Sequence, residues 1–253
     1  MKRVIAVLNQ KGGVGKTTST INLAAYLAKQ GKSVLIVDLD PQGNATSGIG
    51  VDKHNLESTT YDILFSADSP EATIKETAIT NVSILPANAQ LAAAEVDLAA
   101  ETEREYRLKK ALQMLDYDFV LIDCPPSLGL LSINALTAAD FVLVPVQAEY
   151  YALEGLSQLL EIIQRVRSGL NKDLQLLGVV VTMYDSRTAL SEQVVQELKK
   201  HLGDKLMHTI IPRNVRLAEA PSFGRSILEH DKWSKGARAY KNLAKEVVTH
   251  VDK

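Results

Sequence analysis

Five short apolar runs recur along the chain, and none of them alternates regularly with polar residues. They have the length of strands and are rich in valine, isoleucine and leucine: Val4–Leu8, Val34–Val37, Phe119–Ile122, Phe141–Val146 and Leu176–Thr182. Strands of this kind are buried on both faces, as in a parallel sheet that helices cover on each side. The pattern therefore predicts a sheet whose strands are mainly parallel.

The segments between these runs have the apolar spacing of helices. Thr18–Gln30 places its apolar residues on one face and stops at Gly31, and Leu153–Arg167 is predicted to form another helix. Weaker signals predict a short helix at Tyr61–Phe65, a short strand at Val82–Leu85, and helices at Ala89–Ala100, capped by Asn88, and Glu103–Leu115. The alternation predicts an α/β fold: a doubly wound, mainly parallel sheet flanked by helices, in a single domain over residues 1–253.

The stretch between the first strand and the first helix, Asn9–Thr18, is rich in glycine and contains Gly15-Lys16-Thr17. Glycines allow the backbone to turn tightly and to aim several N–H groups at one point. The positive end of the following helix faces the same point, which favours an anion. We therefore expect this loop to hold the phosphates of a nucleotide, through the residues Lys11, Gly12, Gly13, Val14, Gly15, Lys16, Thr17 and Thr18.

Lys16 and Thr17 supply the groups that an ATP–Mg²⁺ complex requires. The lysine offers a positive charge to the β- and γ-phosphates, and the threonine hydroxyl is a hard oxygen ligand for Mg²⁺. The spacing follows the P-loop pattern except at Gln10, which stands where a glycine is expected and is followed by a second lysine, Lys11. A turn that merely joins strand to helix is the alternative, and the order of strand, glycines and helix disfavours it.

Two aspartates follow predicted strands at the carboxyl edge of the sheet, where open α/β sheets bind ligands. Asp40 is a candidate for organising the attacking water or the Mg²⁺ shell, although Asp40-Pro41 could form only a turn. Asp123 ends an apolar strand, as does the aspartate with which P-loop ATPases hold Mg²⁺; a plain strand cap is the alternative. The expected metal ligands are thus Thr17, Asp40 and Asp123.

Composition narrows the class of protein. Apolar residues make up 46% of the 253 positions and charged residues 23%, which are ordinary values for a globular protein. No apolar stretch reaches the roughly 18 residues of a membrane span, and no signal peptide precedes the first strand, so we expect a cytoplasmic protein. The single cysteine, Cys124, excludes an intrachain disulfide and a Cys-based zinc or iron–sulfur site within one chain.

Charge is distributed unevenly along the chain. Residues 1–186 contain 15 Lys and Arg against 22 Asp and Glu, whereas residues 187–253 contain 13 against 8. A basic final quarter on an otherwise acidic protein indicates a polyanionic partner, although charged runs are usually only solvated faces.

The loop with its early lysine resembles the deviant Walker A motif of the ParA/MinD group of P-loop ATPases. Four further segments resemble the Soj-type branch of ParA partition ATPases: Asp38–Gly48, Asp123–Ala138, Glu149–Leu159 and Ile211–Gly224. The resemblance implies that Lys11 reaches across a dimer interface to the partner's nucleotide, so that Lys11, Lys16 and Asp40 are the catalytic residues. It also implies that Pro212 and Asn214 hold the adenine, with Met183 and Asp185 nearby.

The same resemblance implies the partners. Arg187 and Arg216 would contribute to a surface for non-specific double-stranded DNA on an ATP-dependent homodimer, and a ParB-type centromere-binding protein would stimulate slow hydrolysis on the nucleoid. Other basic residues could extend this surface: Arg213, Arg225, Lys232, Lys235, Arg238 and Lys241. With no aromatic platform or recognition helix apparent in the sequence, we expect contacts to phosphates rather than to bases.

Other classes of protein remain as alternatives. A MinD-like membrane-positioning ATPase would carry a C-terminal amphipathic anchor, and an apolar stripe is present at Ala237, Tyr240, Leu243, Ala244, Val247 and Val251. We expect the stripe to pack on the core, and no membrane partner, because it is rich in alanine. An ATP-dependent ligase would need a pocket for a small substrate, for which we identify no residues. A tyrosine autokinase would end in a tyrosine cluster, which this chain lacks.

Overall fold

The computed structural model describes residues 2–66, 69–149 and 152–252, with the side chains of residues 152–154 left out. Residues 150 and 151 of the segment Glu149–Leu159 lie outside the described residues. The described strands form one seven-stranded sheet in the order β3-β4-β2-β5-β1-β6-β7. Their bounds are β1 Arg3–Val7, β2 Val34–Asp38, β3 Lys75–Glu76, β4 Val82–Leu85, β5 Phe119–Asp123, β6 Phe141–Gln147 and β7 Gln175–Thr182.

The predicted fold class is confirmed. All neighbouring strands are parallel except β3, a two-residue edge strand that pairs antiparallel with β4. The predicted strands all form, including β4. The antiparallel edge is absent from the sequence prediction because two residues are too few to show a periodic pattern.

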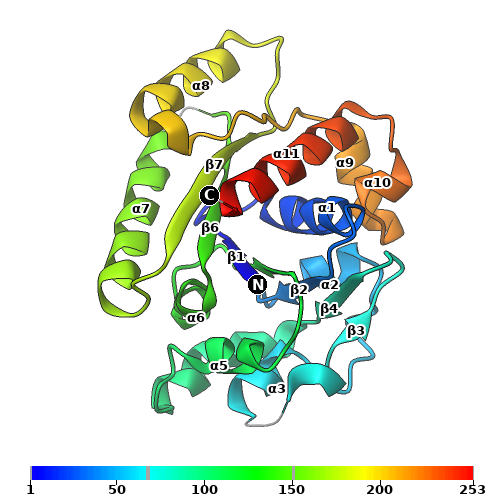
Figure 1. Cartoon of the computed structure of the whole chain (residues 1–253), viewed down its shortest axis with the longest axis vertical. Helices are drawn as coiled ribbons and strands as arrows, with labels where there is room; N and C mark the ends of the chain where they lie inside the picture. The colour runs from blue at the N-terminus through cyan, green and yellow to red at the C-terminus, as the bar shows by residue number, and fades with distance from the viewer. Residues whose placement is uncertain (1, 67–68, 150–151, 253) are drawn as a thin grey trace.

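Helices cover both faces of the sheet (Figure 1). The α-helices are α1 Lys16–Ala28, α2 Asn44–Gly48, α3 Thr60–Phe65, α4 Ala94–Asp97, α5 Arg107–Gln113, α6 Leu130–Ala138, α7 Ala152–Gly169, α8 Ala189–Leu202, α9 Val215–Glu219, α10 Ile227–His230 and α11 Lys235–Val251. One core lies between the sheet and α1, α10 and α11; the other lies between the sheet and α3, α5, α6, α7 and α8. Successive residues of β1 point into different cores, Val4 and Ala6 into one and Ile5 into the other, as a strand requires.

The C-terminal apolar stripe is buried rather than presented to a membrane. Helix α11 lies beside α1 in Figure 1, and every member of the stripe has at most 3% of its surface exposed: Ala237, Tyr240, Leu243, Ala244, Val247 and Val251. The Tyr240 hydroxyl lies 3.1 Å from the Ser19 hydroxyl of α1, which gives the one polar group of the stripe a buried partner. None of the described helices has the length and hydrophobicity to cross a membrane.

Two predicted helices are shorter or more irregular than expected. Ala89–Ala100 consists of the 3-10 turns Ala89–Ala93 and Leu98–Ala100 around the single α-turn of α4. Here tertiary contacts override the preference of alanine for helix, since the Glu95 carboxylate accepts hydrogen bonds from the first N–H groups of α6. The helix expected at Glu103–Leu115 begins only at Arg107, because Glu103 has a left-handed φ of 50°, which an α-helix does not tolerate.

Candidate functional site

The glycine loop joins β1 to α1 with its backbone held from both sides. Gly15 is the N-cap of α1 at a φ of 90°, a left-handed conformation that favours glycine. The Asn9 side chain donates to Pro145 O at 2.7 Å and accepts from the Lys11 N–H at 3.0 Å. From β7, the Thr182 hydroxyl donates to Val14 O at 2.8 Å. The loop is therefore fixed as an open turn in front of the helix N-terminus, which is the geometry of an anion site.

Lys16 is buried at the mouth of this loop. Only 7% of its surface is exposed, and its ammonium donates to Lys11 O at 3.2 Å. None of the ion pairs found among the described residues includes it. Burial lowers the pKa of Lys16, and the carboxylates of Asp123 and Asp40 oppose that shift. A desolvated cation of this kind gains most when an anion enters the site.

Thr17 and Asp123 meet behind the loop. The Thr17 hydroxyl donates to Asp123 Oδ2 at 2.7 Å, and Thr20 lies 3.4 Å from Oδ1 of the same carboxylate. Asp123 is fully buried, and burial together with the charge of Asp38 raises its pKa. Burial and the nearby Asp38 thus disfavour the negative charge of Asp123, and a bound cation would stabilise it. The Asp123 carboxylate and the Thr17 hydroxyl together offer oxygen ligands of the kind that Mg²⁺ prefers.

Asp40 lies on the segment that follows β2. Register pairing places Asp38, the last residue of β2, directly beside Asp123 of β5. Asp38 accepts from the N–H and hydroxyl of Thr46 in α2 and from the Asp40 N–H, so it ties the segment to the sheet edge. Asp40 Oδ1 accepts the Gln42 N–H at 2.9 Å. The turn that was the alternative for Asp40 is therefore present, and the same carboxylate also lines the cavity in front of the loop.

One cavity brings most of the predicted phosphate and metal residues together. Its lining includes six residues of the loop and Asp40: Gly12, Gly13, Gly15, Lys16, Thr17, Thr18 and Asp40. Gly43, next to this cavity, has a φ of 59°, and a Cβ there would lie 2.6 Å from Ala87 O, so only glycine fits.

A second cavity adjoins the first and is lined by three of the four predicted adenine residues. Met183, Pro212 and Asn214 line it together with Gly15 and Thr18 of the loop. A bridge between Tyr184 and Pro212 brings these distant segments side by side. Asp185 is not among the lining residues.

Met183 lines both cavities in a conformation that the sequence does not reveal. Its φ is 52°, which is unusual for a residue other than glycine. Residues with such backbone angles occur preferentially at functional sites, and Met183 lines both cavities. Asn214 caps α9 through its Oδ1, which accepts the Arg216 N–H at 2.9 Å, so its amide nitrogen is the side-chain group that can donate to a molecule in the cavity.

The other lysine assigned to the nucleotide and the two arginines assigned to DNA are exposed and form ion pairs with carboxylates of the same chain. Lys11 pairs with Glu149, Arg187 with Asp185, and Arg216 with Glu219 and Asp231. The two hydrogen bonds from the Arg187 guanidinium lower the pKa of Asp185. Asp185 thus contacts one of the two arginines assigned to DNA.

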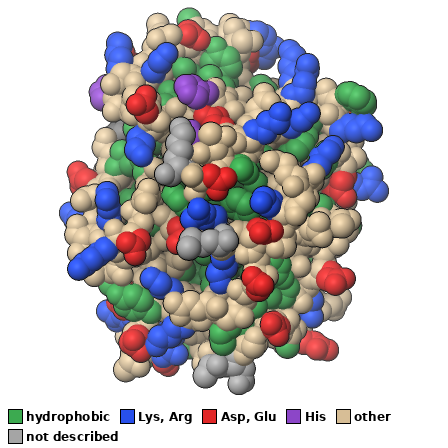
Figure 2. Space-filling model, viewed as in Figure 1, with side chains coloured by type: hydrophobic (Ala, Val, Ile, Leu, Met, Phe, Trp, Pro, Cys, Tyr) green, Lys and Arg blue, Asp and Glu red, His purple; other side chains and the backbone are tan. Residues whose placement is uncertain are grey.

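Basic side chains gather on the side of the molecule that carries α9 and α11. Figure 2 shows Lys and Arg in blue over the upper right of the view, where Figure 1 places these helices. All six residues proposed to extend the basic surface are exposed: Arg213, Arg225, Lys232, Lys235, Arg238 and Lys241. Two large aromatic side chains are exposed among them, Trp233 at 80% and Phe223 at 64%, where no aromatic platform is apparent from the sequence.

Comparison with known proteins gives three concordant findings. A family model described as AAA domain matches residues 2–176. The chain is 55% identical over 252 residues to the sporulation initiation inhibitor protein Soj of Bacillus subtilis, covering 99% of this chain and 100% of that protein. It is 54% identical over 249 residues to the chromosome-partitioning ATPase Soj of Thermus thermophilus, covering 98% of this chain and 96% of that protein.

Among solved structures, cobyrinic acid a,c-diamide synthase from Mycobacterium smegmatis with a bound ATP analogue and magnesium superimposes with a TM-score of 0.88. The sequences are 41% identical, and the match covers 100% of this chain and 97% of that one.

Proposed function

The chain belongs to the Soj/ParA family of chromosome-partitioning ATPases, and from this premise we propose that it hydrolyses ATP to drive DNA partitioning. It acts as one ATPase domain over residues 1–253, in the cytoplasm and on the nucleoid. The observation that carries the proposal is the convergence of Lys16, Thr17 and Asp40 on one cavity, with Asp123 hydrogen-bonded to Thr17 behind them.

ATP and Mg²⁺ are the expected occupants of the two cavities. The triphosphate lies against the loop, where the Lys16 ammonium exchanges its backbone contact for the phosphates. Thr17, Asp40 and Asp123 are the residues that would hold Mg²⁺, which supplies neutralisation of the phosphate charge. The base enters the cavity of Met183, Pro212 and Asn214, where an amide donor faces a base edge and the thioether packs on the ring.

Hydrolysis to ADP and phosphate depends on Asp40. Its carboxylate lines the phosphate cavity and is held there by its own turn, so it can orient a water molecule towards the γ-phosphate. The link from Asp40 through Asp38 to Thr46 couples this position to α2. Loss of the γ-phosphate then loosens the segment Asp38–Gly48, as in switches that a γ-phosphate holds.

ATP binding assembles two chains into a dimer. Lys11 leaves Glu149 and reaches the nucleotide of the other chain, which couples dimerisation to the presence of the triphosphate. Arg187 and Arg216 of both chains then form one surface for non-specific duplex DNA, and the bivalency of this surface raises avidity without a new type of contact. A ParB-type protein stimulates hydrolysis and thereby releases the complex.

One binding experiment tests this function. Binding to random-sequence duplex is measured with ATP, with ADP and without nucleotide, across a salt series. We expect tight binding with ATP alone, and a log–log salt slope of roughly −0.9 per phosphate neutralised. Equal binding in all three nucleotide states would contradict the proposal.

A charge reversal tests where the DNA binds. Arg216→Glu should weaken binding at least about tenfold while ATP-dependent dimerisation persists, because the arginine is exposed and lies outside both nucleotide cavities. Lys110→Glu on α5, in the layer on the other face of the sheet, is the charge-matched control. Undiminished binding of Arg216→Glu would place the DNA on another surface.

A metabolic synthase is a second candidate, because the solved neighbour is named as one. Such an enzyme would couple ATP cleavage to amide formation on a small acceptor. The two candidates differ in what stimulates ATP turnover: duplex DNA with a ParB-type protein, or cobyrinic acid with an amino donor. Stimulation by the small substrates alone would favour the synthase.

A MinD-like membrane role is disfavoured by the burial of the α11 stripe. Co-sedimentation with anionic liposomes in the presence of ATP should therefore leave the protein in the supernatant. Recovery of the protein with the liposomes would restore that alternative.

A further inference from the structure

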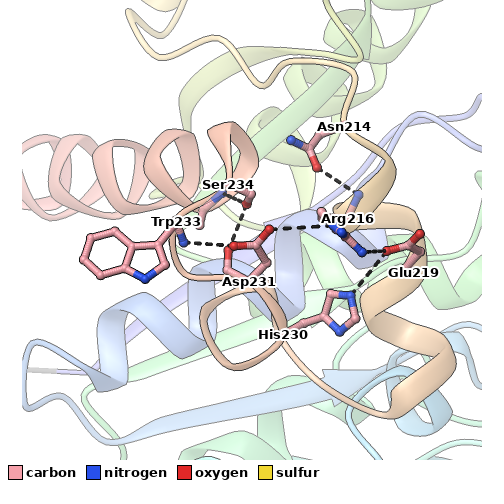
Figure 3. Close-up of polar contacts among 8 residues, drawn as sticks. Asn214, Arg216, Glu219, His230, Asp231, Trp233 and Ser234 are labelled. Atoms are coloured by element: carbon pink, nitrogen blue, oxygen red, sulfur yellow. Dashed lines mark hydrogen bonds and ion pairs between the residues drawn. The ribbon is translucent and has the colours of Figure 1, made fainter.

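Two carboxylates from different elements hold the guanidinium of Arg216. Arg216 Nη1 lies 2.9 Å from Glu219 Oε2, one turn further along α9, and Arg216 Nε lies 3.7 Å from Asp231 Oδ2, which follows α10. Figure 3 shows the arginine lying between the two acids. We call Glu219 and Asp231 the carboxylate clamp.

Among the described residues, the Glu219 carboxylate has polar contacts with Arg216 and His230 alone. Besides Arg216, its Oε2 is approached by His230 Nε2 at 3.5 Å, and the His230 ring stacks on Phe223. Asp231 has a further structural task, because its Oδ1 accepts the Trp233 N–H in the turn that leads into α11. A substitution at Glu219 therefore probes the clamp without disturbing the start of a helix.

The clamp and a DNA phosphate compete for the same group. Carboxylate and phosphate oxygens both accept charge-assisted hydrogen bonds from a guanidinium, and each such bond uses an N–H that the other acceptor then lacks. The Arg216 side chain is 57% exposed, so a phosphate can approach it from solvent. Exposed ion pairs are weak, so a phosphate can displace the carboxylates, but their negative charge still opposes its approach.

We propose that Glu219 holds Arg216 back from DNA and thereby lowers the affinity of each half of the DNA-binding surface. This inference rests on the proposed function, in which Arg216 contacts duplex phosphates. Because each half binds weakly, stable binding requires the two halves that the ATP-bound dimer joins. The clamp thus keeps the affinity of the single chain too low for stable binding, so that stable binding depends on the dimer.

The test removes the charge of Glu219 and keeps its shape. As a single chain, Glu219→Gln should bind random-sequence duplex up to about fivefold more tightly than the unchanged protein. The ATP-analogue dimer, which carries the substitution in both halves, should gain up to about 25-fold. The salt slope should steepen by up to about 0.9 for each chain, because Arg216, then held by Asp231 alone, neutralises a further phosphate more readily. Glu103→Gln, which removes the carboxylate of the exposed pair with Lys110 on the far layer, should change neither quantity.

A double-mutant cycle with Arg216→Ala separates this inference from the function on which it rests. If Arg216→Ala weakens binding, and Glu219→Gln tightens it alone but has no effect in the Arg216→Ala background, the clamp acts through the arginine. A gain that persists without Arg216 is a general effect of charge and overturns the inference. If Arg216→Ala weakens binding but Glu219→Gln alone gives no gain, the clamp is excluded and the DNA surface stands. If Arg216→Ala binds normally, both fail.

Discussion

The Lys11 ammonium lies 2.7 Å from Glu149 Oε2 of the same chain. Lys11 belongs to the glycine loop and Glu149 follows β6, so the pair crosses from the nucleotide site to the neighbouring strand. Both side chains are about half exposed, at 50% and 45%, and an ion pair of this kind contributes only about 0–1 kcal/mol. The contact is therefore strong enough to set where Lys11 rests and weak enough to exchange for a phosphate.

Removing the carboxylate should favour the dimer. We expect Glu149→Gln to lower the dissociation constant of the ATP-analogue dimer by up to about fivefold, because Lys11 no longer breaks an ion pair to reach its partner. Lys11→Ala should bind nucleotide as a single chain and fail to dimerise. Sedimentation velocity with a non-hydrolysable analogue measures both, with Glu103→Gln as the control of equal charge. Weaker dimerisation of Glu149→Gln would show that Glu149 itself serves the interface.

Lys16→Ala should abolish stable ATP binding and spare the fold. The buried ammonium forms no ion pair among the described residues, so its loss breaks no direct contact with a carboxylate. Relief of the cost of burying the ammonium offsets the loss of its attraction to Asp123 and Asp40. The thermal midpoint of the free protein should be unchanged or higher, and the stabilisation that ATP and Mg²⁺ give the unchanged protein should vanish. Lys29→Ala, at the exposed end of the same helix, should keep that stabilisation. Unchanged nucleotide affinity in Lys16→Ala would show that the Lys16 ammonium does not bind the phosphates of ATP.

Asp40 can be tested with two variants that separate its turn from its chemistry. Asp40→Asn keeps an oxygen that can accept the Gln42 N–H, whereas Asp40→Ala removes it. If the carboxylate organises the water, both variants should bind ATP, lose at least about 100-fold in hydrolysis rate and accumulate as ATP-bound dimers. Phosphate release and sedimentation provide the two measurements. Normal turnover in Asp40→Asn would mean that only the turn matters.

The packing of α11 predicts a stability effect that a membrane anchor would not show. Leu243 is fully buried between α11 and the sheet, so Leu243→Ala should lower the free energy of unfolding by about 2–5 kcal/mol. Lys241→Ala, on the exposed side of the same helix, should lie within about 0.5 kcal/mol of the unchanged protein. Urea denaturation measures both values. A small loss in Leu243→Ala would indicate that the helix is loosely docked.

The strands and the phosphate loop could be predicted because their signals are local in the sequence. The sheet strands follow from unbroken apolar runs, and the phosphate loop follows from the order of strand, glycines, lysine and helix, because each signal lies within a few neighbouring residues. The irregular segment 89–100 was missed for the opposite reason. Its conformation depends on Glu95 contacting α6, more than thirty residues further along the chain.

Residue type and short spacing along the chain are enough to predict the strands of the sheet, the phosphate loop and the positions of Asp40 and Asp123 at the carboxyl edge. Which charges meet depends instead on how the chain folds in space. The pairing of Asp38 with Asp123, the contact of Lys11 with Glu149 and the clamp on Arg216 join residues that separate elements bring together. Coulomb and hydrogen-bond energies depend on distance and burial in space, and no spacing along the chain fixes either quantity.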